Sequence, residues 1–225
     1  MKRKYNCNDN FFSEDNELSF YVAGFIAADG CVQVNKGCSK VSAIDIKLSK
    51  NDQEHLENIN NVLGSNRPIK NYENKWSGAS LLRITSDKMC QDLSEKFNIV
   101  PNKSKTYIFP NLVKQHELVN HFMRGYFDGD GSFYIQKQSN EKVCFGLRGT
   151  DSFLTDYRSI LEKQCDFSMR YNKMPVSGGC CQLAYGGNRN IIKISNFLYN
   201  DATIFLNRKK EVALKANQLV GNLYA

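Results

Sequence analysis

The sequence predicts an α+β fold made of two similar half-domains related by a pseudo-twofold axis. The first observation behind this prediction is an internal repeat, since the segment that begins at Val22 recurs without gaps from Met123. The second is that strand-like and helix-like segments follow each copy in the same order. The third is the alternation of polar and apolar residues on those strands, which is typical of sheets that keep one polar face.

The elements of the first unit, residues 16–105, follow from local patterns. A helix ends at Gly30, because glycine often follows the last helical residue. Asparagine and aspartate favour helix starts, so a second helix begins at Asn51 or Asp52. The other expected elements are strands at 31–34, 43–48 and 80–85, and a further helix before the basic cluster 101–105.

The second unit, residues 118–212, repeats this order. Its first helix ends at Gly131, and its second helix begins at Asp151. The other expected elements are strands at 132–135, 143–147 and 182–185, and a helical stretch before the basic cluster 206–210.

The repeat divides the chain into an N-terminal half-domain, residues 1–105, and a C-terminal half-domain, residues 118–225. Residues 106–117 form the linker between them. This linker carries Pro110 and is not rich in Gly or Ser, so we expect it to be ordered.

Composition narrows the class of protein. The chain has 225 residues, 41% of them hydrophobic, so it can bury a core. The apolar run 20–28 is too short to span a bilayer, and the N-terminus lacks the apolar core of a secretory signal. The eight cysteines form no CxxC pair, which argues against structural zinc and for reduced thiols in a cytosolic protein. A net charge of +7 permits a nucleic-acid partner.

The repeated helices bring two carboxylates together. Each helix carries small residues four apart that allow close backbone packing: Gly24 and Ala28 in the first, Gly125 and Gly129 in the second. Asp29 and Asp130 then lie side by side at helix C-termini, where the dipole is negative and the last carbonyls lack intrahelical partners. A cation relieves this unfavourable arrangement. Mg²⁺ accepts such oxygen ligands, and substrate phosphates would complete a phosphodiester-hydrolysis site.

The segments VAGFIAADG and MRGYFDGDG resemble the two motifs of LAGLIDADG homing endonucleases. The resemblance covers nearly the whole chain, including PNKSK at 101–105 and HFMRGYFDGDGSF at 121–133, and is strongest to single-chain members with two motifs. It implies two αββαββα half-domains whose antiparallel strands form a saddle over duplex DNA. It also implies that a monomer cleaves both strands, with a divalent metal, at a long and nearly palindromic site.

The resemblance assigns roles to four motif residues. Asp29 and Asp130 are implied to be the catalytic, metal-binding carboxylates. The backbone carbonyls of Ala28 and Gly129 are implied to be secondary metal ligands. Mg²⁺ is the expected cofactor, with Mn²⁺ or Ca²⁺ as alternative occupants.

Other positions differ between the copies. The sixth motif letter, often acidic in the family, is Asp128 in the second copy but Ala27 in the first. The family also places basic residues near the scissile phosphates, which here correspond to Lys103, Lys105, Arg208 and Lys209. Their expected role is to stabilise the phosphate charge or to polarise water. For each of them, an ordinary basic turn that touches the DNA backbone is the alternative.

The polar strand faces are the expected DNA-reading surface, because a two-stranded ribbon fits the major groove. In the first unit this face carries Cys31, Gln33, Asn35, Asp45, Lys47, Ser49, Arg83 and Thr85. In the second unit it carries Ser132, Tyr134, Gln136, Gln138, Asn140 and Arg148, together with Cys144 and Gly146. Loop residues Lys70, Lys75, Arg170 and Lys173 are expected to contact phosphates.

A protein that binds nucleic acid without cutting is the alternative function. It would be an RNA maturase acting on its host intron RNA, or a DNA-binding regulator on the same scaffold. Both expected carboxylates are present, which favours the endonuclease. The expected location is the cytoplasm, bacterial or phage-infected, or an organellar matrix.

Overall fold

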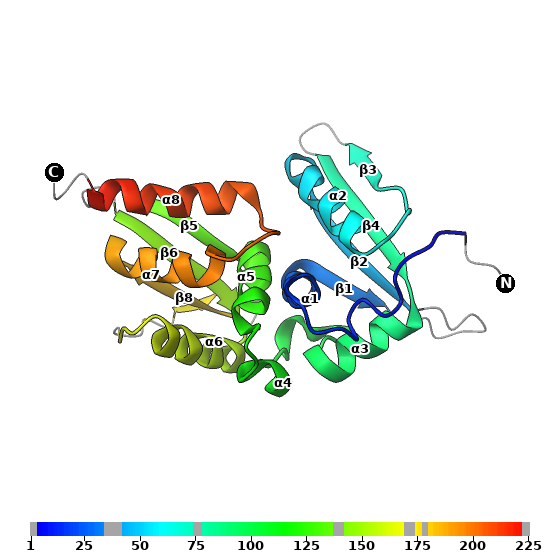
Figure 1. Cartoon of the computed structure of the whole chain (residues 1–225), viewed down its shortest axis with the longest axis horizontal. Coiled ribbons are helices and arrows are strands. Elements are labelled where there is room, and N and C mark those ends of the chain that lie inside the picture. Colours follow the sequence, from blue (N-terminus) through cyan, green and yellow to red (C-terminus); the bar gives the residue numbers. More distant parts are fainter. Residues whose placement is uncertain are drawn as a thin grey trace.

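The computed structural model has two four-stranded antiparallel sheets, each combined with helices of its own half (Figure 1). The structure describes residues 4–33, 42–73, 78–136, 142–168, 174–176 and 180–221. We call elements α1 to α3 the N-terminal half and elements α5 to α8 the C-terminal half. The α+β prediction is confirmed.

The N-terminal half runs α, β, β, α, β, β, α. Its elements are α1 (Glu17–Asp29), β1 (Gly30–Gln33), β2 (Ala43–Ser49), η1 (Lys50–Asp52), α2 (Gln53–Val62), β3 (Lys70–Glu73), β4 (Gly78–Thr85) and α3 (Asp87–Phe97). Two short elements, η2 (Lys103–Lys105) and α4 (Asn111–Lys114), then lead to the second half. The strand order is β1-β2-β4-β3.

The C-terminal half repeats this order and adds a last helix. Its elements are α5 (Val119–Asp130), β5 (Gly131–Gln136), β6 (Lys142–Gly149), α6 (Asp151–Gln164), β7 (Met174–Val176), β8 (Cys180–Gly186), α7 (Asn188–Tyr199) and α8 (Asn207–Gly221). The strand order β5-β6-β8-β7 matches that of the first sheet. Local patterns predicted three strands in each unit, and the fourth is the short edge strand β3 or β7.

Local capping explains where several helices start. Asn16 caps α1 in a reciprocal capping box with Ser19, and Thr150 caps α6 by accepting from the backbone N–H of Phe153. The prediction that this helix begins at Asp151 is confirmed, with Thr150 as the capping residue before it. Asp52 stands at the cap position of α2 but makes no side-chain capping bond, because its carboxylate binds Arg208 instead.

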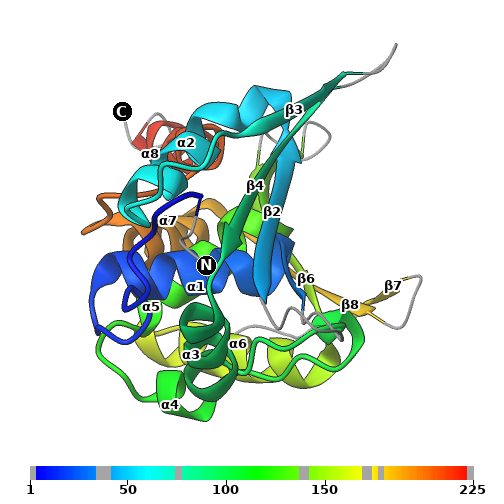
Figure 2. The ribbon, with the colours of Figure 1, turned by 90° about the vertical axis from the view of Figure 1, so that its right-hand side faces the viewer.

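The helices cover one face of each sheet and leave the other face open. Figure 2 places the strands of both sheets towards one side of the molecule and most helices towards the other. On β2 and β6 the residues expected to be apolar and inward, such as Ile44, Ile46, Phe145 and Leu147, are buried. The open faces therefore point the same way, as two arms of one surface.

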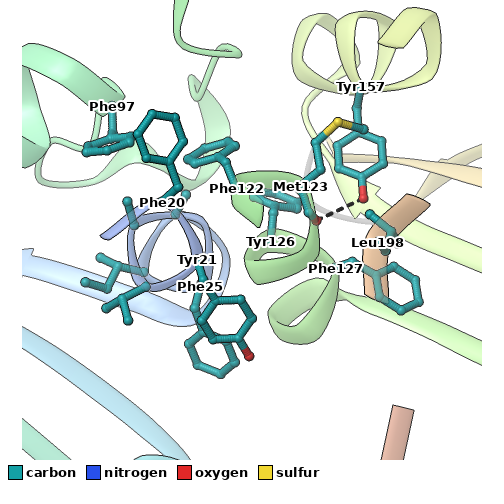
Figure 3. Packing of buried hydrophobic residues seen from close by; sticks show 14 of the residues in the cluster. Phe20, Tyr21, Phe25, Phe97, Phe122, Met123, Tyr126, Phe127, Tyr157 and Leu198 are labelled. Carbon is teal, nitrogen blue, oxygen red and sulfur yellow. Dashed lines mark hydrogen bonds between the residues drawn. The ribbon is translucent and has the colours of Figure 1, made fainter. Parts of the chain in front are cut away.

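The centre of the molecule is the contact between α1 and α5. Phe20 and Phe122 approach it from opposite helices, and Phe97 stacks on Phe122 with ring centroids 6.0 Å apart (Figure 3). The hydroxyl of Tyr157 donates to the backbone carbonyl of Met123 at 3.0 Å. Aromatic packing of this kind fixes the position of both helices.

Candidate active site at the paired helix ends

Glycine brings the backbones of α1 and α5 into direct contact. A Cβ atom on Gly24 would lie 2.1 Å from the carbonyl oxygen of Phe122, and one on Gly125 would lie 2.0 Å from that of Tyr21. A Cβ on Gly129 would lie 2.3 Å from the Cβ of Ala28. Side chains cannot occupy such gaps, so the predicted small-residue contact is confirmed.

The contact aligns the C-terminal ends of the two helices. Asp29 is the last residue of α1 and Asp130 is the last residue of α5. The chain then enters a strand directly, because Gly30 (φ −88°) and Gly131 (φ −93°) have extended backbones. The predicted helix ends at these two glycines are confirmed. Glycine is needed because a Cβ would lie within 2.7 Å of Ile26 or Phe127.

The two carboxyl groups influence each other. Burial of the Asp130 carboxyl group is the main reason that its pKa is raised to about 6, and repulsion from the Asp29 carboxylate is the second reason. Burial likewise raises the pKa of Asp29, while Lys209 and Lys103 oppose that rise. Both aspartates still border solvent at the surface. The site thus concentrates negative charge that a bound cation would stabilise.

Lys209, near the start of α8, lies beneath the end of α5. Its ammonium group donates to the carbonyl oxygens of Phe127 at 2.9 Å, Asp128 at 2.5 Å and Gly129 at 3.0 Å. The side chain is almost completely buried, which lowers the pKa of Lys209 to about 8. Lys209 therefore caps the helix that ends in Asp130.

Lys103 has a different contact in the N-terminal half. Its buried ammonium group donates at 2.7 Å to the carbonyl oxygen of Gly30, in the first residue of β1. Burial lowers the pKa of Lys103, and the charges of Asp130 and Asp29 partly offset that effect. Both lysines therefore lie close enough to Asp29 and Asp130 to lower the pKa of these carboxyl groups, although each binds a different part of the backbone.

The other two predicted basic residues lie further out. Lys105 is exposed at the end of η2. Arg208 pairs with Asp52 through two nitrogen atoms, at 3.0 Å in each case, so it connects the start of α8 with the start of α2. Their assignment as catalytic residues stays a prediction.

Asp128 belongs to a buried polar cluster. Its carboxylate accepts from the hydroxyl of Tyr199 at 2.6 Å, the hydroxyl of Tyr21 at 2.8 Å and the backbone N–H of Leu206 at 2.8 Å. Nε2 of His55 lies 3.0 Å from the same Tyr21 oxygen. The cluster joins α1, α2, α5 and α7 two residues before Asp130 on α5. Apart from Asp128, no local motif marks these residues.

Arg124 makes a second buried link between the halves. Its guanidinium donates to Glu17 on α1 at 2.7 Å and to the carbonyls of Leu198 and Ile204. Nδ1 of His121 lies 2.7 Å from Nη1. Sequence reasoning did not identify this arginine, because its partners other than His121 are far away along the chain.

The donor set at the helix ends suits a hard divalent cation. Among the described residues, no group of three His, Cys, Asp or Glu side chains is arranged to hold a metal. The chain instead offers the carboxylates of Asp29 and Asp130 and helix-end carbonyls, of which that of Gly129 already accepts from Lys209. Oxygen ligands of this kind fit Mg²⁺ or Ca²⁺, with the remaining positions supplied from outside the chain.

The open face of the N-terminal sheet carries a charged cluster. Arg83 on β4 donates to Asp45 on β2 through Nε at 2.6 Å and Nη2 at 2.5 Å. The Gln33 amide donates to Asp45 at 2.9 Å. These residues share a face with Cys31, Lys47, Ser49 and Thr85, as the register of β1, β2 and β4 requires.

Among the described residues, the open face of the C-terminal sheet carries no carboxylate, and its charges are the two exposed cations Lys142 and Arg148 on β6. Ser132, Tyr134 and Gln136 on β5 are exposed, and Arg148 is exposed at the end of β6. Cys144 and Gly146, expected to be open, are buried because the side chains of β5 and Gln182 lie over them. The predicted residues Asn35, Lys75, Gln138, Asn140, Arg170 and Lys173 lie outside the described residues.

Among the described residues, none of the helices is both long enough and apolar enough to span a bilayer.

Comparison with known proteins agrees with this geometry. Residues 22–115 match the family model described as LAGLIDADG endonuclease. No curated protein sequence matches the chain significantly.

Solved structures match nearly the whole chain. The homing endonuclease I-WcaI bound to its DNA recognition sequence superposes with a TM-score of 0.64 and 12% identity, covering 89% of this chain and 90% of that chain. The meganuclease I-SmaMI bound to uncleaveable DNA gives 0.61 and 14%, with coverages of 89% and 90%. The LAGLIDADG homing endonuclease I-GzeII in complex with a DNA target gives 0.58 and 16%, with coverages of 94% and 93%.

At these identities the structural likeness shows the fold, and the matched segment carries the family signature. Residues 22–115 of this chain match the LAGLIDADG endonuclease family, and about nine-tenths of the chain shares the fold of the LAGLIDADG meganucleases.

Proposed function

We propose that the protein is a site-specific homing endonuclease that hydrolyses one phosphodiester in each strand of duplex DNA. The observation that carries the proposal is the position of Asp29 and Asp130. They end two helices that touch backbone to backbone, and burial raises the pKa of both. Carboxylates held together at such a cost are typical of catalytic sites.

Duplex DNA is the substrate that the open sheet faces favour. The two faces lie on the same side of the molecule, and the chain carries a net charge of +7 (Figure 2). A two-stranded ribbon fits the major groove of B-DNA, and basic side chains contact phosphates. Two similar arms suit a long, nearly palindromic site. A single chain supplies both carboxylates, so the protein acts as a monomer.

Each part of the site then has a role. A divalent cation, Mg²⁺ in the first place, would be held by Asp29, Asp130 and the carbonyls of Ala28 and Gly129, and would activate water and neutralise phosphate charge. Lys103 and Lys209 hold the helix ends and keep positive charge beside the carboxylates. Lys105 and Arg208 are exposed, so they can approach DNA phosphates.

The test replaces each carboxylate by the amide of the same size. Asp29→Asn and Asp130→Asn should each lower double-strand cleavage by at least about 100-fold, because a cation ligand is lost. Binding of the same DNA should change only a few-fold. The target is first selected from a randomised duplex library with Mg²⁺, and EDTA should abolish cutting.

Asp156→Asn is the matched control, because Asp156 on α6 pairs with Lys114 away from the helix ends. It should cut at the wild-type rate. Wild-type cutting of bound DNA by both motif variants would overturn the catalytic assignment. Sequence-specific binding without cutting by the wild type, with Mg²⁺ present, would favour the maturase or regulator instead.

A further inference from the structure

One row of side chains on the open face of the N-terminal sheet contains a charged pair held by several hydrogen bonds. The register aligns Cys31, Asp45 and Arg83 across β1, β2 and β4. Arg83 binds Asp45 with two nitrogen atoms, and the Gln33 amide also donates to Asp45. Such a fork-to-fork pair fixes the plane of the guanidinium group.

The pair is oriented with its cation outward. The Asp45 side chain is only 12% exposed, whereas that of Arg83 is 42% exposed. A lone carboxylate on this face would repel DNA phosphates. Because Arg83 covers the carboxylate, the pair instead presents the positive guanidinium group to a molecule that approaches the sheet.

The donors of Arg83 can be counted one by one. Of its five N–H groups, the Nε group and one on Nη2 bind Asp45. The second on Nη2 reaches the Gln33 carbonyl oxygen at 3.2 Å, the longest bond of the cluster. Among the described residues, the two on Nη1 have no hydrogen-bond partner. The outer edge of the guanidinium, Nη1 and Nη2, is therefore available for an incoming group with two acceptors.

Guanine is the base with two adjacent acceptors in the major groove, O6 and N7. Adenine and cytosine each present an amino donor there, which would face the donors of Arg83, and thymine offers a single acceptor. The guanidinium edge therefore discriminates by chemistry as well as by charge.

We propose that Gln33, Asp45 and Arg83 form the guanine-reading element of the N-terminal half. The inference rests on the proposed function and names the base that this part of the sheet selects. Arg83 contacts O6 and N7 through Nη1 and Nη2, replacing its long bond to Gln33. Asp45 is a positioning residue, since it holds the guanidinium plane without reaching the base.

The neighbouring cations have a different part. Lys47 and Lys70 lie over the ring of Tyr72, and Arg67 lies over that of Tyr5. Together with Arg83 and Leu81, several of these residues border a hollow of about 440 Å³. They lack the fixed two-point geometry of Arg83, so they suit phosphates and add affinity rather than base choice.

The mirror position in the C-terminal half has no such element. The register there aligns Ser132, Gly146 and Ala184, which are small and uncharged. The preferred guanine should therefore occur in one half-site and not at its mirror position. The target departs from a palindrome at this base pair.

The experiment is selection of bound sequences from a randomised duplex library, followed by competition with single-base variants of the selected site. Wild type should prefer guanine at one position by on the order of 10- to 100-fold, the range of a good bidentate contact. Arg83→Lys keeps the charge but removes the fork, so this preference should fall to about 3-fold or less, with other positions unchanged. Asp45→Asn should lower it partly.

Lys47→Ala is the matched control, because it removes a positive charge from the same sheet face. It should weaken binding to all sequences similarly and keep the guanine preference. A wild type that selects a site while Arg83→Lys leaves every base preference intact would overturn this inference alone. The inference would also be overturned if Arg83→Lys lost a preference for adenine, cytosine or thymine instead of the preference for guanine. If the wild type selects no sequence, the proposed function fails together with the inference.

Discussion

The two halves of the molecule share their motif helices but differ around them. The row across the open face next to the motif is Cys31–Asp45–Arg83 in the N-terminal half. In the C-terminal half the same row is Ser132–Gly146–Ala184. The repeat therefore keeps its central helix contact while this row of the open sheet face carries different side chains.

The lysines differ in a similar way. Lys209 donates three hydrogen bonds to the last turn of α5, whereas Lys103 donates one to the strand that follows α1. Asp128 anchors a buried cluster behind α5, while its counterpart Ala27 is apolar. Asp29 and Asp130 thus occupy equivalent positions, but the end of α5 receives more hydrogen bonds from buried side chains than the end of α1. We expect symmetry in the helix contact and asymmetry in everything around it.

The largest effect should come from the symmetric contact. Gly24→Ala and Gly125→Ala each place a Cβ about 2 Å from a partner carbonyl oxygen, so α1 and α5 must move apart. Overpacking costs up to about 3 kcal/mol, which corresponds to a fall in Tm of roughly 6–12 °C for a chain of this size. Because the contact is symmetric, both variants should lose similar stability and much of their cleavage rate.

Calorimetry of the two variants, with cleavage of the selected site, measures this. Gly186→Ala is the stability control, because a Cβ there would meet only the Cys144 sulfur, at 3.7 Å. A clear difference between the two motif variants would break the symmetry argument. Wild-type stability in both would mean that the helices do not touch at these glycines.

The lysines should behave unequally. Methionine keeps the length of the side chain but removes the ammonium group. Hydrogen bonds from charged groups contribute about 1.5–3 kcal/mol each, less the cost of burying the charge. The lowered pKa values of both lysines indicate that this cost is substantial. With three bonds against one, Lys209→Met should destabilise by about 2–4 kcal/mol and Lys103→Met by about 1 kcal/mol.

Urea unfolding of both variants tests the ranking. Lys163→Met, on the last turn of α6, controls for loss of a surface charge. Nicking assays with each strand labelled add a functional readout, since unequal support should slow the cutting of one strand more than the other. Equal destabilisation by the two substitutions would remove the asymmetry between the motif ends.

These differences mark the limit of sequence reasoning. The motif helices and their terminal aspartates were predictable, because small residues four apart and a repeated Asp-Gly are local patterns. The exposed and buried sides of β2 were predictable from alternation. The pairing of Asp45 with Arg83 was not, because it depends on the register between strands 38 residues apart.

Long side chains were the other difficulty. Lys103 and Lys209 contact backbone carbonyls 73 to 82 residues away, which no local pattern shows, and their expected role near the scissile phosphates stays a prediction. The sequence indicated that Asp52 caps a helix, but its carboxylate instead binds Arg208, which lies 156 residues later. Local sequence shows that a charge is present, whereas only the packed chain decides what it pairs with.

The smallest effect should come from the link between Arg208 and Asp52, which joins the start of α8 to the start of α2. Asp52→Asn, Arg208→Gln and the double variant form a thermodynamic cycle. The pair joins two halves, and both guanidinium contacts are 3.0 Å long. The Arg208 side chain is nevertheless 58% exposed, so water and salt screen the attraction.

We therefore expect a coupling free energy of about 0.5–1 kcal/mol, or a Tm change of roughly 1–4 °C. The cycle is needed because Asp52→Asn also removes negative charge from the start of α2, which weakens that helix by itself. Raising the salt concentration to about 1 M, where the Debye length is about 3 Å, should remove most of the coupling. A coupling free energy of about 2 kcal/mol or more that persists at high salt would mean that the Asp52–Arg208 pair contributes strongly to holding the two halves together. The smaller value would leave the α1–α5 contact, with its buried polar links, as the interaction that holds the two carboxylates together.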